Sequence, residues 1–268
     1  MRISGVWKRL ATAVVLIPAF VWVVLHASLL IFHAFIVALS AGASWELARM
    51  LQRAGRPTHA RLAVAGTMVV AASFLVPGAA PIALVAVLLV VLTASLSAPT
   101  SESVESAATT LLAVTYVGWL LGHAAPLRGL PSGAALVLFL VAVTWAGESA
   151  AYAVGSTLGR RKLAPVISPR KTVEGTVAQV VASLGVAALL GRWLLADWSM
   201  PHLLGAGLLL GVLGQVGDLA ESAIKRSLGT KDTGGMIPGH GGLLDRLDSL
   251  LFNTPALFYY VTFVRGGA

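Results

Sequence analysis

Long apolar runs separated by short polar segments dominate the chain. Nine of these runs come close to the roughly 20 residues that a helix needs to cross a bilayer at 1.5 Å per residue. The uninterrupted run over residues 82–92 lacks the in-and-out alternation of a membrane barrel strand. The pattern therefore predicts an all-α, polytopic membrane protein, a single integral membrane domain over residues 1–268. The predicted spans cover residues 10–26, 28–45, 62–77, 80–98, 107–124, 133–155, 173–195, 202–221 and 249–264.

The composition excludes a water-soluble globule. Of the 268 residues, 57% are apolar and 11% are charged, whereas soluble domains are about 25% charged. A disordered chain is excluded as well, because disorder needs low hydrophobicity and high net charge. The chain has no cysteine, so disulfides, thiolate catalysis and cysteine-containing metal sites are also excluded.

The positions of the basic residues predict the orientation of the chain. When loops are assigned to alternate sides of the membrane, 16 of the 19 Lys and Arg residues fall on the side of the N-terminus. Cytoplasmic loops collect Lys and Arg, so the N-terminus is predicted in the cytoplasm and the C-terminus outside. This bias accounts for the net charge of +8 without nucleic acid as a partner. The three exceptions are Arg128, Arg192 and Arg265.

The first 27 residues could instead be a secretory signal, since Lys8 and Arg9 precede an apolar run. That run exceeds the 7 to 15 residues usual for a signal peptide. A retained first span is therefore expected.

Two predicted loops are longer than a connection requires. They cover residues 156–172 and the stretch from Asp218 to Asp248, and both fall on the predicted cytoplasmic face. Long loops in a compact protein are usually functional or disordered, and these two are rich in specific polar residues. The C-terminal part, about residues 145–250, is therefore expected to carry the active site.

Acidic residues gather in the second of these loops. Five of the eleven Asp and Glu residues lie between Asp218 and Asp248. Asp218 and Glu221 are spaced i,i+3 at the end of the eighth predicted span, and Asp245 and Asp248 have the same spacing at the start of the ninth. Residues with this spacing share one helix face. Two helix ends could thus present up to four carboxylates to one point.

Two interpretations of this acidic cluster are open. Carboxylates at membrane depth normally face a cavity or a partner, and Mg²⁺ takes oxygen ligands while leaving room for phosphates. Alternatively, the acids form a structural ion network with the four nearby cations. We favour the metal. The cations are Lys225, Arg226, Lys231 and Arg246.

A glycine-rich turn separates the two acidic pairs. It reads Pro-Gly-His-Gly-Gly over residues 238–242, and glycines let backbone N–H groups approach an anion. His240 could contact a phosphate or carry a proton, or be an ordinary hydrogen-bonded loop residue. Neither a Walker A sequence nor a GxGxxG after a strand is present, so the standard soluble nucleotide folds are not indicated.

The loop before the seventh predicted span ends in the sequence Ser-Pro-Arg-Lys-Thr, residues 168–172. Basic residues beside a bilayer could bind anionic headgroups. A helix start, however, offers unpaired N–H groups and a positive dipole end. This segment is therefore predicted to bind an anion.

Together these motifs resemble the signature of the phosphatidate cytidylyltransferase family, also called CDP-diacylglycerol synthases. The resemblance rests on Ser222-Ala-Ile-Lys-Arg226, Lys231-Asp232, Pro238-Gly-His-Gly-Gly242 and Leu244-Asp-Arg-Leu-Asp248. The first loop is also similar, with residues 162–165 and 168–175. This family usually has Asp at the position of Glu148, and Lys and Trp are common at those of Arg170 and Val173.

The resemblance implies transfer of a cytidylyl group from CTP to phosphatidic acid, with Mg²⁺, in a two-metal type of reaction, for phospholipid biosynthesis at the cytoplasmic face of the inner membrane. CTP, phosphatidic acid and membrane lipids are the implied partners. The implied catalytic residues are Asp218, Lys225, Arg226, Lys231, Asp232, His240, Asp245, Arg246 and Asp248. The implied substrate-binding residues are Ser168, Lys171, Thr172, Glu174, Gly239, Gly241 and Gly242. The implied metal ligands are Asp218, Glu221, Asp245 and Asp248.

Other classes of membrane protein remain alternatives. A CDP-alcohol phosphotransferase would carry a DGxxAR segment, which the sequence lacks. A lipid or polyprenol kinase would add a phosphate rather than a nucleotide, and a cation transporter would need a polar path through both halves of the membrane. Gly207 and Gly211 form a GxxxG that could support a homodimer, although packing within one chain is the expected use.

Overall fold

The computed structural model describes residues 3–237 and 241–266, and the side chains from residue 14 onward within these ranges. Its contacts divide the chain into two compact units. Unit 1 comprises Met1–Pro126 with Leu228–Leu247, and unit 2 comprises Leu127–Ser227 with Asp248–Ala268. Nearly all regular structure in the described residues is helical, which confirms the all-α class.

Unit 1 contains a run of apolar helices and a loop segment from later in the chain. Its elements are α1 (Ile3–His26), α2 (Leu29–Arg53), α3 (Ala60–Ser73), α4 (Ala79–Ser95), α5 (Ser103–Ala113), the π-helical η1 (Val114–Trp119), α6 (Leu120–Gly122) and the 3₁₀ turn η2 (Leu244–Arg246), while α7 (Ala124–Gly129) spans the boundary to unit 2.

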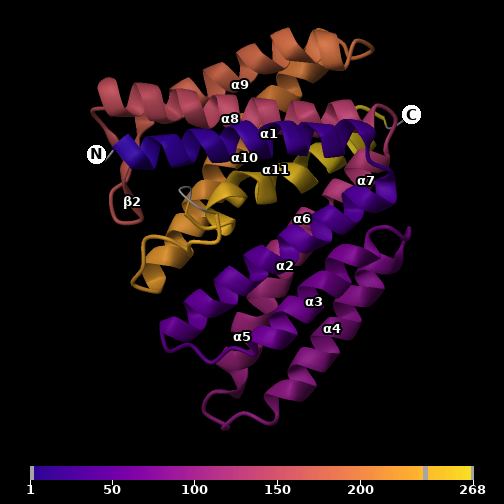
Figure 1. The fold of residues 1–268 in the computed structure, drawn as a ribbon, viewed down its shortest axis with the longest axis vertical. Helices are drawn as coiled ribbons and strands as arrows, with labels where there is room; N and C mark the ends of the chain where they lie inside the picture. Colours follow the sequence, from indigo (N-terminus) through magenta and orange to yellow (C-terminus); the bar gives the residue numbers. More distant parts are fainter. Residues whose placement is uncertain (1–2, 238–240, 267–268) are drawn as a thin grey trace. The chain divides into compact units, whose positions relative to one another are not determined.

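The core of unit 1 forms where α3 packs against α2, α4 and η1 (Figure 1). Val70, Val87 and Val114 are buried there. Gly66 allows α3 to approach closely, because a Cβ atom at this position would lie 2.8 Å from Cγ1 of Val87. Close packing of this kind supplies dispersion contacts where a lipid environment gives little hydrophobic drive.

Unit 2 contains long helices and one small hairpin, with α8 packed along α9 and α10 packed along α9 and α11 (Figure 1). Phe139, Leu203 and Leu210 are buried between them. The elements are α8 (Gly133–Thr157), β1 (Lys162–Ala164), β2 (Ser168–Thr172), α9 (Val173–Leu194), α10 (Met200–Ser227), α11 (Asp248–Tyr259) and the π-helical η3 (Tyr260–Val264).

The segment predicted as a loop over residues 156–172 differs from expectation. Helix α8 continues to Thr157, and the remainder contains the antiparallel pair β1–β2, with Lys162 opposite Thr172 and Ala164 opposite Ser168. Backbone pairing satisfies polar groups that a free loop would leave to water. The hairpin thereby gives the basic residues of this segment defined positions.

Helices occur at all nine predicted spans, but they differ in length. Among the residues whose side chains the structure describes, five helices are long and apolar enough to cross a membrane: Leu29–Arg53, Ser103–Gly129, Gly133–Thr157, Val173–Leu194 and Met200–Ser227. Shorter apolar helical stretches in the same part of the chain cover Val14–His26 within α1, Ala60–Ser73 and Ala79–Ser95. The chain is thus an α-helical membrane protein, while the count of nine spans and the orientation stay predictions.

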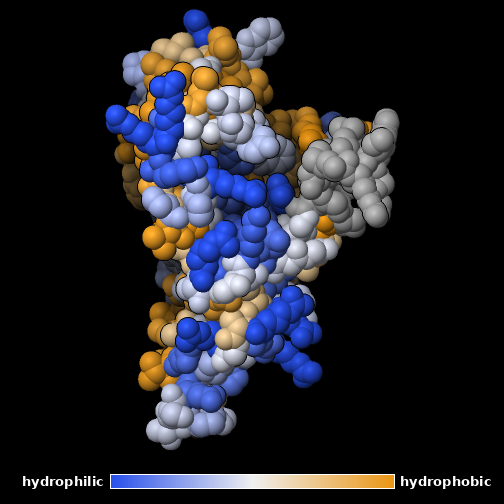
Figure 2. Space-filling model, turned by 90° about the vertical axis from the view of Figure 1, so that its left-hand side faces the viewer, coloured by the Kyte–Doolittle hydropathy of each residue, from blue (hydrophilic) through white to orange (hydrophobic). Residues whose placement is uncertain are grey.

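The surface of both units carries exposed apolar side chains. On α4, Ile82 is 72% exposed, and on α9, Leu189 is 74% and Trp193 is 88% exposed. Figure 2 shows one face, on which hydrophilic residues gather and hydrophobic residues border them. Apolar side chains exposed on this scale belong against lipid in a membrane protein.

The GxxxG motif packs α10 against α9 within unit 2. A Cβ atom at Gly207 would lie 2.6 Å from Cβ of Ala187, and one at Gly211 would lie 3.0 Å from Cβ of Ser183. Small residues let helix backbones approach in this way. The motif is therefore used inside the chain, as expected.

Replacing Gly207 with alanine should destabilise the protein. The new methyl group would overlap Ala187 and push α9 and α10 apart, and overpacking of this kind typically lowers the unfolding free energy by about 1–3 kcal/mol. Gly185→Ala on α9 is the matched control, because a Cβ atom there meets nothing within 4 Å. A thermal melt should show a lower midpoint for G207A and an unchanged or higher midpoint for G185A; equal midpoints would contradict the packing role.

Candidate active site

A cavity of about 540 Å³ lies within unit 2, between α8, the hairpin, α9 and α10. Lys162, Arg170 and Lys171 line it, together with the acids Glu148 and Asp218. Three cations and two carboxylates leave a formal charge of +1. The cavity therefore suits an anion, and its volume is in the range of small-molecule sites.

Close backbone contacts build the wall of this cavity. The side chain of Thr172 caps α9 by accepting a hydrogen bond from the N–H of Gly175 at 3.2 Å. A Cβ atom at Gly175 would lie 2.8 Å from the carbonyl oxygen of Ala151 on α8. Glycine at this position thus lets the start of α9 lie directly against α8.

Glu174 connects the hairpin to α9. Its carboxylate accepts hydrogen bonds from the backbone N–H groups of Arg160 and Arg161 at 3.1 and 3.2 Å. These charge-assisted bonds are stronger than neutral ones. Glu174, predicted from the resemblance to bind substrate, positions the hairpin in the structure. Ser168 is half-buried opposite Ala164 in the hairpin and is outside the cavity lining.

An ion pair between Lys171 and Asp218 crosses one side of the cavity. Nζ of Lys171 lies 2.7 Å from Oδ2 of Asp218, and the two side chains are 17% and 34% exposed. Lys171 comes from β2 and Asp218 from α10, 47 positions later in the sequence. The fold thus brings together a predicted substrate-binding residue and a predicted metal ligand.

Polar residues of the cavity that the sequence reasoning missed lie on α9 and α10. Thr176 lies 3.5 Å from Oε1 of Gln215, and Gln179 is buried. Nε2 of Gln215 is buried and has no hydrogen-bond partner among the described residues. Gln215 precedes Asp218 by three positions and so lies on the same face of the helix. This spacing was the signal in the sequence that could have identified Gln215 as a site residue.

An ion pair and a hydrogen bond organise the end of α10. Oε2 of Glu221 lies 2.9 Å from Nζ of Lys225, one turn along the helix, and the Glu221 side chain is 1% exposed. Nε of Arg226 donates to the carbonyl oxygen of Ile167 at 3.3 Å, which connects α10 to the hairpin. These cations thus hold the structure in addition to any role toward a substrate.

Several acidic side chains of unit 2 lie near the start of α11 without forming a tight cluster. The charges of Asp218, Glu221 and Glu148 act on Asp248, whose Oδ1 accepts a hydrogen bond from the N–H of Ser249 at 2.7 Å. Their oxygens are the donors that hard divalent cations prefer. Within the described parts of the chain, however, no three Asp, Glu or His side chains are grouped closely enough to hold one metal ion.

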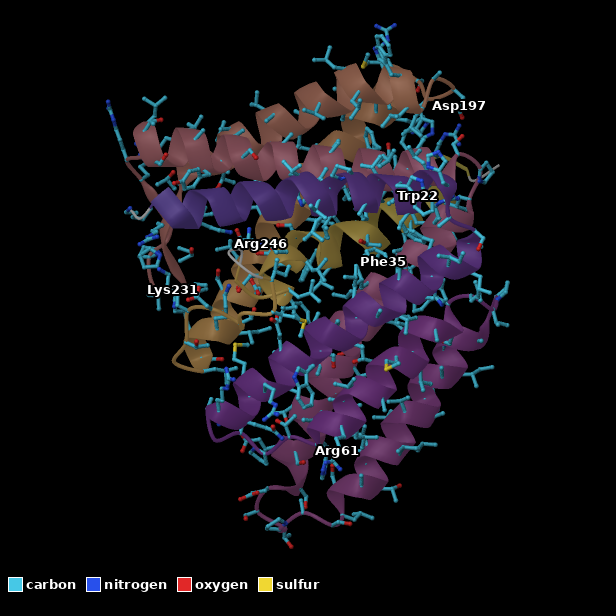
Figure 3. The ribbon with its side chains drawn as sticks, in the orientation of Figure 1. Trp22, Phe35, Arg61, Asp197, Lys231 and Arg246 are labelled. Carbon is cyan, nitrogen blue, oxygen red and sulfur yellow. The ribbon has the colours of Figure 1, made fainter. Side chains whose placement is uncertain are left out.

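The remaining predicted site residues lie in unit 1. Lys231 and Asp232 lie ahead of the described turn residues Gly241 and Gly242, and Asp245 and Arg246 lie in η2. Figure 3 labels Lys231 and Arg246, which come from opposite ends of this segment. Gly239 and His240 lie outside the described residues.

The expectation that Asp245 and Asp248 share one helix is wrong. Asp245 lies in the 3₁₀ turn η2, whereas Asp248 starts α11 after the break at Leu247. The reason is that Oδ2 of Asp245 accepts hydrogen bonds from both the N–H and the hydroxyl of Thr233, at 3.2 and 2.9 Å, and from the N–H of Gly242 at 3.2 Å. The carboxylate thereby closes the glycine-rich segment on itself.

Glu46 on α2 holds the same segment from the other side. Its side chain is 5% exposed, and its carboxylate accepts hydrogen bonds from the backbone N–H groups of Met236 and Leu244 at 3.3 and 2.9 Å. A Cβ atom at Gly234 would lie 2.6 Å from Oε1 of Glu46. One buried carboxylate of unit 1 thus anchors the segment over residues 231–246, which contains the glycine-rich turn and is called the signature segment below.

Sequence reasoning missed Glu46, although a signal existed. It is the only acidic residue in the first 101 positions, and ionisable residues in apolar helices are rare and usually functional. Its partners lie almost 200 positions away, however, so the sequence alone could not identify what it binds.

The chain matches the cytidylyltransferase family over residues 7–264. This match covers nearly the whole sequence and includes every site residue discussed above. The chain belongs to the cytidylyltransferase family. The resemblance inferred from the motifs is therefore confirmed at the level of the family.

Individual relatives match this chain over part of its length. It is 44% identical over 151 residues to a phosphatidate cytidylyltransferase of Bacillus subtilis, covering 55% of each chain. It is 37% identical over 174 residues to a phosphatidate cytidylyltransferase of Staphylococcus aureus, covering 65% of this chain and 66% of the relative. An uncharacterized protein of Escherichia coli, YnbB, is 44% identical over 154 residues, covering 58% of this chain and 51% of that protein. The matching part of this chain spans about half the length of the Bacillus subtilis relative and of YnbB.

Replacing Glu46 with alanine should loosen the signature segment. The change removes the acceptor of two buried backbone donors, and each donor left unsatisfied lowers the unfolding free energy by about 1–3 kcal/mol. Glu46→Gln keeps one acceptor oxygen and should have a smaller effect. Limited trypsin digestion should show faster cleavage at Lys231 and Arg246 in E46A than in E46Q.

The matched control is Glu102→Ala, which removes an exposed acid of the same unit. It should digest like the unmodified protein. If E46A and E102A were cleaved at the same rate, the anchoring role of Glu46 would be excluded.

Proposed function

We propose that this protein transfers a cytidylyl group from CTP to phosphatidic acid, giving CDP-diacylglycerol and pyrophosphate. The observation that carries the proposal is the cationic cavity of unit 2, in which Lys171 and Asp218 form an ion pair. The family match and the relatives named phosphatidate cytidylyltransferase support the same reaction.

The cavity suits a reaction between two polyanions. An oxygen of the phosphatidate phosphate attacks the α-phosphorus of CTP, the bond between that phosphorus and the β-phosphate oxygen breaks, and pyrophosphate leaves with the electron pair. Lys162, Arg170 and Lys171 offer positive charge to phosphate oxygens in the cavity. No strong base is required, because a phosphate monoester is already largely ionised at neutral pH.

Within this reaction, the described residues have distinct roles. Lys171 binds a substrate phosphate and in the free protein neutralises Asp218. Gln215 has a buried amide N–H group available for a ligand of the cavity. Thr172 and Glu174 position the hairpin and the start of α9. Asp245 and Glu46 hold the glycine-rich segment of unit 1 in shape.

Mg²⁺ is the proposed cofactor. The carboxylates of Asp218, Glu221 and Asp248 offer the oxygen donors that hard divalent cations prefer. The ion pairs of Asp218 with Lys171 and of Glu221 with Lys225 support the proposal, because they place positive charge beside these carboxylates. Asp218, Glu221 and Asp248 would hold the metal once their carboxylates lie closer together than in this structure, where no three acids of the described residues are grouped closely enough for one ion. Asp245, the fourth ligand that the resemblance implies, stays a prediction. When bound, divalent ions offset the negative charge of the phosphates and stabilise the leaving pyrophosphate.

We propose an inner-membrane protein with about nine spans, an N-terminus in the cytoplasm, a C-terminus outside and an active site on the cytoplasmic face. The distribution of Lys and Arg supports this topology, because 16 of them fall on the side of the membrane assigned to the cytoplasm and 3 on the opposite side. The possible homodimer stays a prediction, which the mass of the protein in a lipid nanodisc would test.

Purified protein in phosphatidate-containing vesicles should incorporate label from α-³²P-labelled CTP into lipid when Mg²⁺ is present. Thin-layer chromatography should identify the product as CDP-diacylglycerol, with release of one pyrophosphate for each nucleotide transferred. Excess EDTA should abolish the reaction, and added Mg²⁺ should restore it. Label in lipid only from γ-labelled nucleotide would indicate a kinase instead, and full velocity in EDTA would exclude the metal.

Lys171→Ala should weaken substrate binding more than it slows turnover. Loss of a charged hydrogen bond to phosphate corresponds to roughly a tenfold to hundredfold rise in KM for one substrate. Steady-state kinetics with each substrate varied in turn separates KM from kcat. Arg160→Ala is the control, because this exposed residue keeps its backbone bond to Glu174 and lies outside the cavity lining. A pure kcat defect in K171A would contradict the binding role.

A further inference from the structure

A second cavity, of about 510 Å³, lies within unit 1, far in sequence from the segments used above. It is formed where α2 ends, α3 starts and α4 ends. Arg49, Arg61, His59 and Trp45 line it, with Gln52 and the small or apolar residues Ala60, Leu62 and Ala94. Among the described residues no acid lines this cavity, so its formal charge is +2 without counting His59.

The cations of this cavity are available to a ligand. Arg61 is exposed and makes no ion pair or hydrogen bond with the described residues, and Figure 3 labels it. The guanidinium of Arg49 lies 4.4 Å from the centre of the Trp45 ring, a cation–π contact that orients it without neutralising its charge. Two positive charges thus line one hollow, and that of Arg49 is oriented by the Trp45 ring.

His59 adds a hydrogen-bonding group at the same place. Its ring nitrogen Nε2 is buried and has no hydrogen-bond partner among the described residues. The backbone around it is held, because its N–H donates to Oγ1 of Thr110 at 3.1 Å and the side chain of Gln52 donates to the carbonyl of Thr58 at 3.1 Å. A buried polar atom without a partner is a reason to expect a ligand.

Apolar surface continues from the cavity along all three helices. On α3, exposed Ala65 and Met68 follow Arg61 at helical spacing, and on α4, exposed Val90 lies one turn before Ala94. On α2, the exposed ring of Trp45 lies one turn from Arg49 toward the apolar part of the helix. A ligand with a charged head and long apolar chains would contact both the basic cavity and the apolar surface beside it, whereas a free phosphate would contact only the basic cavity.

We propose that this cavity binds the phosphate headgroup of an anionic phospholipid, with Arg49, Arg61 and His59 on the phosphate and the acyl chains over Met68 and Val90. Trp45 suits the boundary between the two, because tryptophan is enriched at membrane interfaces. The site is separate from the cationic cavity of unit 2, and the proposal does not depend on the proposed reaction.

Native mass spectrometry of delipidated protein titrated with phosphatidylglycerol tests the site. The double variant Arg49→Gln and Arg61→Gln should bind the first lipid more weakly by a factor on the order of 30, as expected for two lost arginine contacts. The control is Arg53→Gln with Arg192→Gln, which removes the same charge from exposed positions outside the cavity and should bind like the unmodified protein. Equal melting temperatures establish that the variants are folded.

Competing ligands distinguish the lipid from other sources of phosphate. Phosphatidylcholine should bind more weakly than phosphatidylglycerol, and millimolar inorganic phosphate should not displace the lipid. Brominated phosphatidylglycerol should quench a component of the fluorescence that Trp45→Phe removes. Equal weakening in both double variants, equal binding of phosphatidylcholine, displacement by inorganic phosphate, or quenching unchanged by W45F would each overturn the proposal.

Discussion

A charged group inside an apolar helical protein is stable only where the fold supplies a partner, and this constraint organises both units. In unit 1 the carboxylate of Glu46 is buried on α2 and accepts backbone hydrogen bonds from a segment almost 200 positions later. In unit 2 Asp218 and Glu221 are each paired with a lysine. Leaving such a carboxylate unpaired in the interior would cost several kcal/mol. Polar residues of the candidate site therefore also hold the hairpin and the glycine-rich segment in place.

The same constraint explains the dual nature of the predicted site residues. Glu174 and Asp245 were expected near substrate or metal, and in the structure both accept backbone N–H groups and shape the segments around them. Lys171, in contrast, pairs with a side chain that lines the same cavity. An ion pair in a cavity can be exchanged for a phosphate or a metal ion, because both partners keep access to the ligand. A carboxylate that caps a turn cannot be released as easily.

Much of the fold could be predicted from the sequence, because helix length and apolar composition are local properties. The helices α8, α9 and α10 lie at the predicted spans, and Gly207 and Gly211 pack α10 on α9 as expected. The hairpin β1–β2 was not predicted, since its pairing depends on how α8 and α9 bring its ends together. The break at Leu247 was also missed, because Asp245 turns back to Thr233 and Gly242 instead of continuing a helix.

The sequence by itself determined the class of the protein, the family motifs and the segments that carry polar chemistry, because these depend on composition and on spacing along the chain. Only the tertiary structure decided that Lys171 meets Asp218, that Gln215 and Thr176 join the cavity, and that Glu46 anchors the glycine-rich segment. It also brought Arg49, Arg61 and His59 around one hollow. These partners come from different helices, and which helices pack together is set by close contacts such as those at Gly66 and Gly175, which no local pattern encodes.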